Sequence, residues 1–412
     1  MTAPSPYVLD PRGEHVQEEI RRLRERGPIT RVALPAGVPA WAVTDAALLK
    51  DLLTDSRVSK DATQHWAAFR AGNIPADWPL MPWVASRHMF TAYGSDHRRL
   101  RRLISPAFTQ RRTMALRPRI EQITQATLHR TAAAATDATG RPQAVDLRQE
   151  FAYPIPIEVI GELIGVPAHL ASSLRRCADR AFDTSSTPEQ MRANQAELQR
   201  TLEELIAYRQ DRPGDDLTSV LLGMREQDDD ALSDDELLAT IRLVIIAGHE
   251  TTVNLLDQAV TALLTHPEAL AAVRSGEATW DQVIEETLRY EGPVVSTPLR
   301  YAVEDIDTGD VVIRKGEAIL ALFAAAGRDP EVHDDADVFD LARENPQHIA
   351  FGHGVHHCIG APLARLEASV ALPALFGRFP DMSFAVEPGT IPADIGFISN
   401  GHSALPVHLG HR

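Results

Sequence analysis

The sequence predicts a mainly α-helical protein with a small β-rich region, and three observations support this. Apolar residues recur at three- and four-residue spacing through most of 95–290, which is typical of amphipathic helices. Strand-like alternation gathers only near 29–44 and 300–325. No internal repeat or low-complexity linker divides the 412 residues. We therefore expect a single domain over 1–412, although length alone would allow two or three.

The helical pattern is clearest in three segments. Residues 117–140 end at a glycine and residues 187–214 at a Pro-Gly pair, both usual helix stops. The third segment begins at Ser233, which is followed three residues later by Glu236 in a capping box, and it closes at Pro267. Roughly 33 residues at a rise of 1.5 Å make a helix of about 50 Å, long enough to cross the whole molecule.

The strand signals are shorter. Residues 29–44 read as a hairpin with a Pro/Gly turn, and residues 305–323 as two short strands. The aromatic-rich segment 53–89 is broken by three prolines and fits no regular element. It is either a lid over a functional site or a loop packed on the core, and both interpretations stay open.

Composition limits the class of protein. Lys+Arg 41 against Asp+Glu 57 gives a net charge of −16, which argues against binding nucleic acid. We expect no signal peptide, because the N-terminus lacks a basic start and an apolar run. No stretch of about 18 apolar residues predicts a membrane span. Cys177 and Cys358 cannot form a disulfide framework, so a reducing cytoplasm is expected, with Cys177 an ordinary structural residue.

The long central helix has an unusual middle, "AGHETT" at 247–252. A glycine in a helix interior costs about 1 kcal/mol relative to alanine, and a buried carboxylate needs a partner. In one interpretation His249 and Glu250 face solvent and the threonines bond to carbonyls of their own helix. In the other, the helix opens locally, Gly248 lets something approach the backbone, and Glu250 and Thr251 carry protons into a dry site.

The segment "FGHGVHHCIG" at 351–360 places three histidines beside Cys358. A structural zinc site usually takes four ligands from two close pairs, and no second Cys/His pair occurs elsewhere. A nucleophilic cysteine needs a base positioned by a third group, which nothing in the local pattern sets up. The residues therefore support a zinc site and a nucleophilic cysteine less well than they support a third alternative.

In the third alternative, the sulfur of Cys358 binds a large flat ligand. A helix begins just after the cysteine, with Pro362 near its first turn. Free amides and the helix dipole there are expected to stabilise a thiolate. Gly354 and Gly360 are expected to leave room for the ligand. A single thiolate with an open face suits the axial position of a haem iron.

These residues carry a resemblance to a known family. The haem-thiolate signature of the cytochrome P-450 superfamily is similar to the run of Phe351, Gly354, His356, Cys358, Gly360 and Leu363-Ala364-Arg365. Three further segments resemble the family in the right order, and together they extend the resemblance over essentially the whole chain: "DHRRLRRLISPAFT" at 96–109, "AGHETT" at 247–252, and Glu286 with Arg289, joined by Arg343.

The resemblance implies a triangular helical body at 95–290 with a small β region. It also implies haem b (iron protoporphyrin IX), held between the central helix and the helix after the loop 351–360, with Cys358 as axial thiolate. By family position, the haem propionates would meet His97, Arg101, Arg300 and His356. The full set of implied cofactor-binding residues is His97, Arg101, Ala247, Gly248, Arg300, Phe351, His356, Cys358 and Gly360.

The implied reaction is that of a monooxygenase, which inserts one atom of O2 into a C–H bond. Glu250 and Thr251 would be the catalytic proton relay. A chain with two cysteines has no iron–sulfur signature, so electrons would come from a separate ferredoxin and its NAD(P)H-dependent reductase. A peroxide-driven relative and a non-catalytic haem sensor are the alternatives, and the acid–alcohol pair counts against both.

The implied substrate is a bulky apolar small molecule, steroid- or macrolide-like. The substrate-binding residues by family position are Trp83, Val84, Ile246, Ala247, Val295, Ser296, Phe397 and Ile398. The ferredoxin would dock on the arginine-rich segment that contains Arg98, Arg99, Arg101, Arg102, Arg111 and Arg112. For Arg98 and Arg102 a solvated basic patch remains the alternative.

Overall fold

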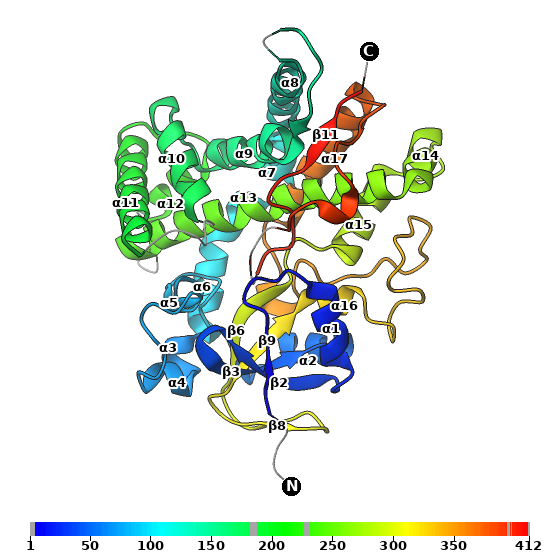
Figure 1. Ribbon diagram of the computed structural model, residues 1–412. Helices are drawn as coiled ribbons and strands as arrows, with labels where there is room; N and C mark the ends of the chain where they lie inside the picture. The colour runs from blue at the N-terminus through cyan, green and yellow to red at the C-terminus, as the bar shows by residue number, and fades with distance from the viewer. Residues whose placement is uncertain are drawn as a thin grey trace.

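The structure is a computed structural model that describes residues 5–137, 139–181, 188–225, 231–393, 396 and 398–410. Helices form most of it, as predicted, and a small β-rich part lies at one end, at the bottom of Figure 1. The helices are α1 Val16–Arg24, α2 Ala46–Thr54, α3 Ala62–His65, α4 Ala67–Arg70, α5 Met81–Ala85, α6 Gly94–Ile104, α7 Gln110–Ala115, α8 Arg117–Ala134, α9 Pro154–Ile164, α10 Ala168–Ala181, α11 Pro188–Asp211, α12 Leu217–Arg225, α13 Asp234–Thr265, α14 Pro267–Ser275, α15 Trp280–Tyr290, α16 Phe323–Gly327 and α17 Ala361–Arg378.

The long helix α13 organises the helical part and runs across the middle of Figure 1. The predicted capping box at its start is confirmed, with Ser233 and Glu236 bonding to each other's backbone N–H. It packs against α9, α15 and α17, and their apolar faces share the main hydrophobic core. The predicted helix at 117–140 ends earlier, at Ala134, because the carboxylate of Asp137 accepts backbone N–H groups and closes a turn there.

The strands are β1 Tyr7–Val8, β2 Ile29–Leu34, β3 Val38–Val43, β4 Val58–Ser59, β5 Val145–Asp146, β6 Ser296–Ala302, β7 Ile306–Asp307, β8 Val312–Ile313, β9 Ala318–Leu322, β10 Ser383–Phe384 and β11 Pro406–His408. A six-stranded sheet has the order β1-β2-β3-β9-β6-β4. The hairpin predicted at 29–44 is confirmed as β2 and β3. The small sheet β10-β11-β5 was not predicted.

The prediction of two strands at 305–323 is wrong, because the segment forms three. Gly309 and Gly316, both at positive φ, break it at two places. The first two pieces, β7 and β8, pair only with each other, whereas β9 enters the large sheet between β3 and β6. Glycine takes this left-handed conformation without the steric cost that other residues carry.

Segment 53–89 was expected to be either a lid or a loop packed on the core, and the structure distinguishes these interpretations for part of it. Trp66 and Trp78 are each only 2% exposed, and Trp66 stacks on Tyr301 of β6 at 5.3 Å between ring centroids. This part is core packing, so the lid interpretation is wrong for it. Trp83 in α5 is only half-buried and packs on the edge of the same apolar cluster.

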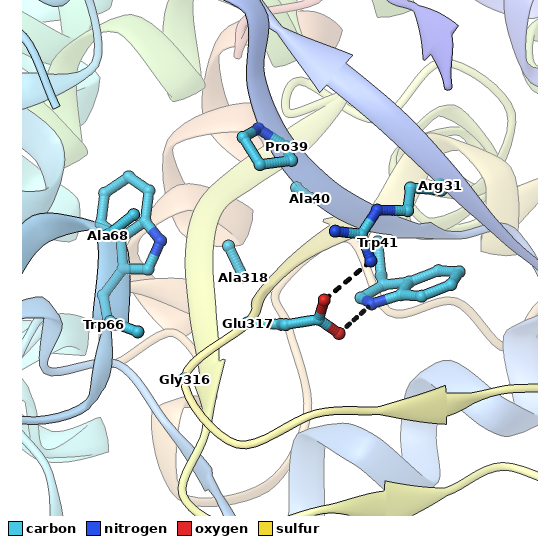
Figure 2. A pocket seen from close by; sticks show the side chains of 10 residues that line it. Arg31, Pro39, Ala40, Trp41, Trp66, Ala68, Gly316, Glu317 and Ala318 are labelled. Carbon is cyan, nitrogen blue, oxygen red and sulfur yellow. Dashed lines mark hydrogen bonds and ion pairs between the residues drawn. The ribbon is translucent and has the colours of Figure 1, made fainter. Parts of the chain in front are cut away.

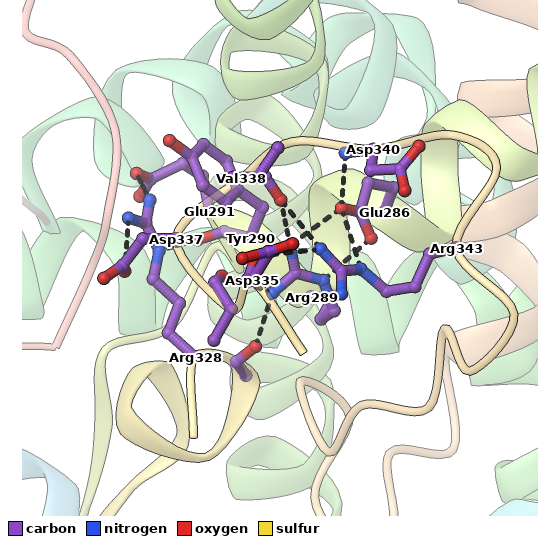
Figure 3. Close-up of polar contacts among 12 residues, drawn as sticks. Glu286, Arg289, Tyr290, Glu291, Arg328, Asp335, Asp337, Val338, Asp340 and Arg343 are labelled. Carbon is purple, nitrogen blue, oxygen red and sulfur yellow. Dashed lines mark hydrogen bonds and ion pairs between the residues drawn. The ribbon is translucent and has the colours of Figure 1, made fainter. Parts of the chain in front are cut away.

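A buried ion-pair network joins α15 to the segment that follows α16 (Figure 3). Glu286 binds Arg289 through two hydrogen bonds of 2.7 and 2.8 Å, and both side chains are at most 2% exposed. Arg289 also donates to the carbonyl oxygens of Gly327, Ala336 and Val338. Arg343 contacts Glu286 at 3.4 Å, so the second arginine lies where the resemblance placed it.

We predict that Glu286→Ala lowers the free energy of unfolding by about 3–5 kcal/mol, because it leaves Arg289 buried without a counter-charge. Denaturant unfolding of the purified protein measures the loss. The matched control is Arg314→Ala, which breaks an exposed pair with Asp305 and should change little. Equal effects of the two substitutions would contradict a structural role for the buried pair.

Candidate active site

Cys358 lies in a tight loop directly before α17. Its backbone N–H donates to the carbonyl oxygen of Phe351 at 2.8 Å, which closes the loop 351–360. The side chain of Cys358 is exposed, yet protein surrounds it deeply enough that burial is the main influence on its pKa. A Cβ on Gly360 would lie 3.8 Å from the sulfur, in ordinary contact with it, so the role of this glycine in leaving room for the ligand stays a prediction.

Burial raises the pKa of the Cys358 thiol, whereas the amides of Gly360 and Ala361 and the charge of Arg101 lower it. The amides at this helix N-terminus therefore act in the expected direction, and burial opposes them. A metal ion bound to the sulfur would deprotonate it outright.

Gly354 does not leave room for a ligand, contrary to the sequence interpretation. It has φ +71°, and a Cβ there would lie 2.6 Å from the carbonyl oxygen of Leu53 at the end of α2. Both the backbone conformation and this close approach require glycine. The residue therefore fixes the loop against α2.

The three histidines of the loop do not converge with the cysteine. His353 and His357 are exposed, whereas the His356 ring lies on the His97 ring of α6, with centroids 4.1 Å apart. Within the described ranges, no three His, Cys, Asp or Glu side chains are grouped closely enough to hold a metal ion. The histidines thus do not form the ligand pairs that the zinc alternative requires.

Basic side chains gather on one side of the loop. Burial and nearby positive groups, Arg101 first among them, lower the pKa of His97 to about 4. Its Nε2 is buried and has no hydrogen-bond partner in the described structure. The pKa of His356 is lowered strongly by burial and by the same kind of neighbours, including Arg300. Lys60 also lies in this group, and the sequence analysis missed it.

This arrangement fits haem b. The cofactor carries two carboxylates, and the predicted propionate contacts His97, Arg101, Arg300 and His356 do come together in the fold. Two arginines gathered beside these histidines, with an orphaned buried nitrogen on His97, call for anionic partners. The structure thus offers one sulfur ligand and a place for two negative charges.

The middle of α13 has one face that is less buried than the rest. Ala247 is exposed and Ile246 and Thr251 are half-buried, although they lie midway along a helix whose other faces are buried. Thr251 Oγ1 donates to the carbonyl oxygen of Ala247 at 2.7 Å. A Cβ on Gly248 would come within 2.5 Å of Ile160 Cδ1 in α9. What approaches this glycine is therefore helix α9, and its contact with the cofactor stays a prediction.

The interpretation that His249 and Glu250 face solvent is wrong, because both are buried. Glu250 accepts from Arg148 Nη2 at 2.5 Å, and Arg148 Nη1 lies 3.4 Å from Asp257. Asp257 in turn binds His402. Sequence reasoning missed Arg148, Asp257 and His402, which hold the acid of the predicted relay. Burial lowers the pKa of His249 to about 3, which keeps its ring neutral.

Four of the eight predicted substrate contacts belong to one apolar cluster, whereas Ile246 and Ala247 lie on α13 outside it. Val84 and Val295 are buried in it, and Trp83 and Ile398 pack on its edge. The backbone N–H of Val295 donates to the carbonyl oxygen of Ile398 at 2.8 Å, which ties two of these segments together. Ser296 is fully buried at the start of β6. Phe397 lies outside the described residues.

Comparison with known proteins decides the family. The family model for Cytochrome P450 matches residues 163–276 and 279–395. The 2-hydroxy-5-methyl-1-naphthoate 7-hydroxylase of Streptomyces carzinostaticus is 43% identical over 408 residues, 99% of this chain and 98% of that protein. The chain belongs to the cytochrome P450 family. It is a haem b protein with the cysteine thiolate as axial ligand, and a monooxygenase that uses O2; this sets aside the sensor alternative.

Two solved P450 structures show the same fold. CYP154A1 from Streptomyces coelicolor A3(2) is 51% identical with a TM-score of 0.90, and the match covers 98% of this chain and 100% of that one. Testosterone-bound CYP154C4 from Streptomyces sp. ATCC 11861 is 44% identical with a TM-score of 0.93 and 99% coverage of both chains. None of the described helices of this P450 is long and apolar enough to span a membrane.

A small cleft at the sheet edge is unrelated to this site (Figure 2). It lies beside Trp41, where Glu317 accepts from Arg31 and from the indole of Trp41 at 2.7 Å each. Its volume of about 170 Å³ is small for a ligand pocket, which typically measures about 300–1,000 Å³. None of the predicted site residues lines it.

Proposed function

We propose that this P450 hydroxylates a bulky apolar small molecule, steroid- or macrolide-like, using electrons from a separate ferredoxin and its NAD(P)H-dependent reductase in the cytoplasm. The apolar cluster formed by Val84, Val295, Trp83 and Ile398 carries the substrate part of the proposal. Its lining offers surface for an apolar molecule and few polar groups to orient a charged one.

Two relatives support this choice of substrate. One is by name a hydroxylase of a substituted naphthoate, and the other is the testosterone-bound structure. Both named molecules contain fused rings. In this chain the segments around Trp83 and Ile398 contribute to the same cluster, and a rigid apolar ligand would bury its surface against both.

The substrate class is tested by screening steroids, macrolides and fatty acids against the purified ferric protein. We expect a steroid or macrolide to shift the Soret band as water leaves the haem, with Val295→Lys abolishing that shift because it places a charge in the apolar cluster. Val386→Lys, at an exposed valine near the C-terminus, is the control. A response to fatty acids alone would reject the proposed substrate class.

The bound haem supplies the oxidising chemistry, and the chain supplies protons in the right place. The Thr251 hydroxyl donates to Ala247 O at 2.7 Å, and its oxygen can accept a further hydrogen bond on the half-buried face of α13. Its neighbour Glu250 is held on the opposite side by Arg148. We infer that Glu250 is the carboxylate that returns protons to the Thr251 hydroxyl, with Arg148 fixing its position between turnovers.

We predict that Thr251→Ala leaves substrate binding and NAD(P)H consumption intact but diverts electrons to hydrogen peroxide. Loss of a positioned proton-transfer group typically lowers the coupled step by about 10²–10⁴-fold. The ratio of product to peroxide measures the effect. Thr252→Ala is a matched control, because the Thr252 hydroxyl is buried against its own helix and bonds to Gly248 O at 3.3 Å. Equal coupling in parent and Thr251→Ala would remove Thr251 from the relay.

The proposed ferredoxin site is narrower than the sequence suggested. Arg99 is bound to Glu236, and Arg112 forms an ion pair with Asp215 at 3.2 Å, so neither is free to meet a partner. Arg98 and Arg102 on α6 and Arg111 on α7 are exposed, and Arg102 has a further contact within the chain. Helix α6 contacts the cysteine loop through the rings of His97 and His356, which supports a docking site close to this loop.

We predict that the first electron transfer slows as salt rises, because the Debye length falls from about 10 Å at 0.1 M to about 3 Å at 1 M. Arg98→Glu should slow it by about tenfold at low salt, since opposite charges mainly raise the association rate. Stopped-flow reduction by an acidic ferredoxin measures the rate. The control is Arg200→Glu on α11, an exposed arginine away from the loop. A rate indifferent to salt and to Arg98→Glu would place docking elsewhere.

A further inference from the structure

Lys60 is an unusual residue in this chain. Only three of its 41 basic residues are lysines, at positions 50, 60 and 315. Lys60 follows β4 and is only 3% exposed. Its Nζ lies 3.3 Å from the ring centroid of Phe90. Within the part of the chain that the structure describes, no carboxylate pairs with it. Charged side chains are almost never fully buried without a partner.

The neighbours of Lys60 are also basic, which strengthens the argument for an anionic partner. Strands β4 and β6 are antiparallel with Ser59 opposite Tyr301, and one step further this register places Lys60 opposite Arg300. Like charges directly across a strand pair destabilise a sheet. Arg300 is itself buried, and its Nη1 donates to the Thr297 hydroxyl at 3.0 Å. Lys60 also acts electrostatically on His97 and His356.

A buried charge without a partner is strongly destabilising, so a compensating group from outside the described chain would offset this cost. The offset must be anionic, because every charged or titratable neighbour named above is basic. It must also reach an interior position shared with His97, His356 and Arg300. Haem b, the cofactor that this protein binds, carries carboxylates that are such anions.

We propose that the Lys60 ammonium binds a carboxylate of the haem, as a cofactor-binding residue additional to the histidines and arginines at this site. The Phe90 ring then lies against the lysine partner of this ion pair and positions its side chain. Because Phe90 also lies edge-on to Trp83, at 6.5 Å between centroids, the pair connects the haem carboxylate to the helix that contributes to the proposed substrate cluster.

The holoenzyme tests this through haem release, measured as transfer to excess apomyoglobin. Lys60→Met keeps the length of the side chain and removes its charge, and we expect release about 10- to 100-fold faster, as for loss of a charge-assisted hydrogen bond. Lys60→Arg should restore most of the retention. Lys315→Met, at an exposed lysine, is the matched control and should change nothing.

A second arm separates carboxylate binding from ordinary packing. Parent and Lys60→Met are each loaded with the dimethyl ester of haem b, which lacks both charges. The two proteins should then release the cofactor at the same rate. An unchanged release rate of haem b in Lys60→Met overturns the proposal, and so does an equal acceleration with haem b and with the ester, since that would be a packing effect.

The parent protein provides a measurement should Lys60→Met fail to yield holoenzyme. Lysine labelled with ¹⁵N at Nζ gives only three resonances in this chain. The Lys60 signal, assigned by its loss in Lys60→Arg, should differ between holoenzyme loaded with haem b and holoenzyme loaded with the ester. A signal at the same position in both overturns the proposal. Neither result depends on the substrate or the electron donor, so the proposed function is tested separately.

Discussion

Two adjacent carboxylates on α15 fix the position of the cysteine loop, and the rest of the site depends on them. Glu286 binds Arg289 and reaches Arg343, which holds the segment between α16 and the loop. Glu285 accepts two hydrogen bonds from Arg365 of α17, at 2.6 and 2.8 Å, and contacts His348 at 3.0 Å. Burial raises the pKa of Glu285, but the bonds from Arg365 and His348 dominate and lower it to about 2. The loop is therefore anchored on both sides by one helix.

The site has an excess of basic side chains on one side and an excess of carboxylates on the other. Near the loop, Lys60, His97 and Arg300 lie together without a carboxylate partner among the described residues. On the far side of α13, Glu250 and Asp257 share Arg148. The first imbalance suits a doubly charged cofactor. The second imbalance holds the Glu250 carboxylate against Arg148, and Asp257 extends the contact to His402.

The sequence predicted the parts of this site that depend on local spacing. The capping box of α13, the Glu286–Arg289 pair and the helix after Cys358 each follow from residues a few positions apart. The partners of Glu250 could not be found in this way, because Arg148 lies 102 residues away and reaches it only through the packing of α13 against the turn before α9. The roles of Gly354 and Lys60 likewise depend on contacts with distant segments.

The contact between Gly248 and Ile160 ties two distant positions together. The Cδ1 atom of Ile160 packs directly against the backbone of α13 at Gly248. The size of this isoleucine side chain therefore sets the distance between α9 and α13 at this point. A larger residue at 248 would have to be matched by a smaller one at 160 to keep that spacing. Since Ala247 and Thr251 lie on the same stretch of α13, the volume at position 160 helps to set the position of these two residues relative to α9.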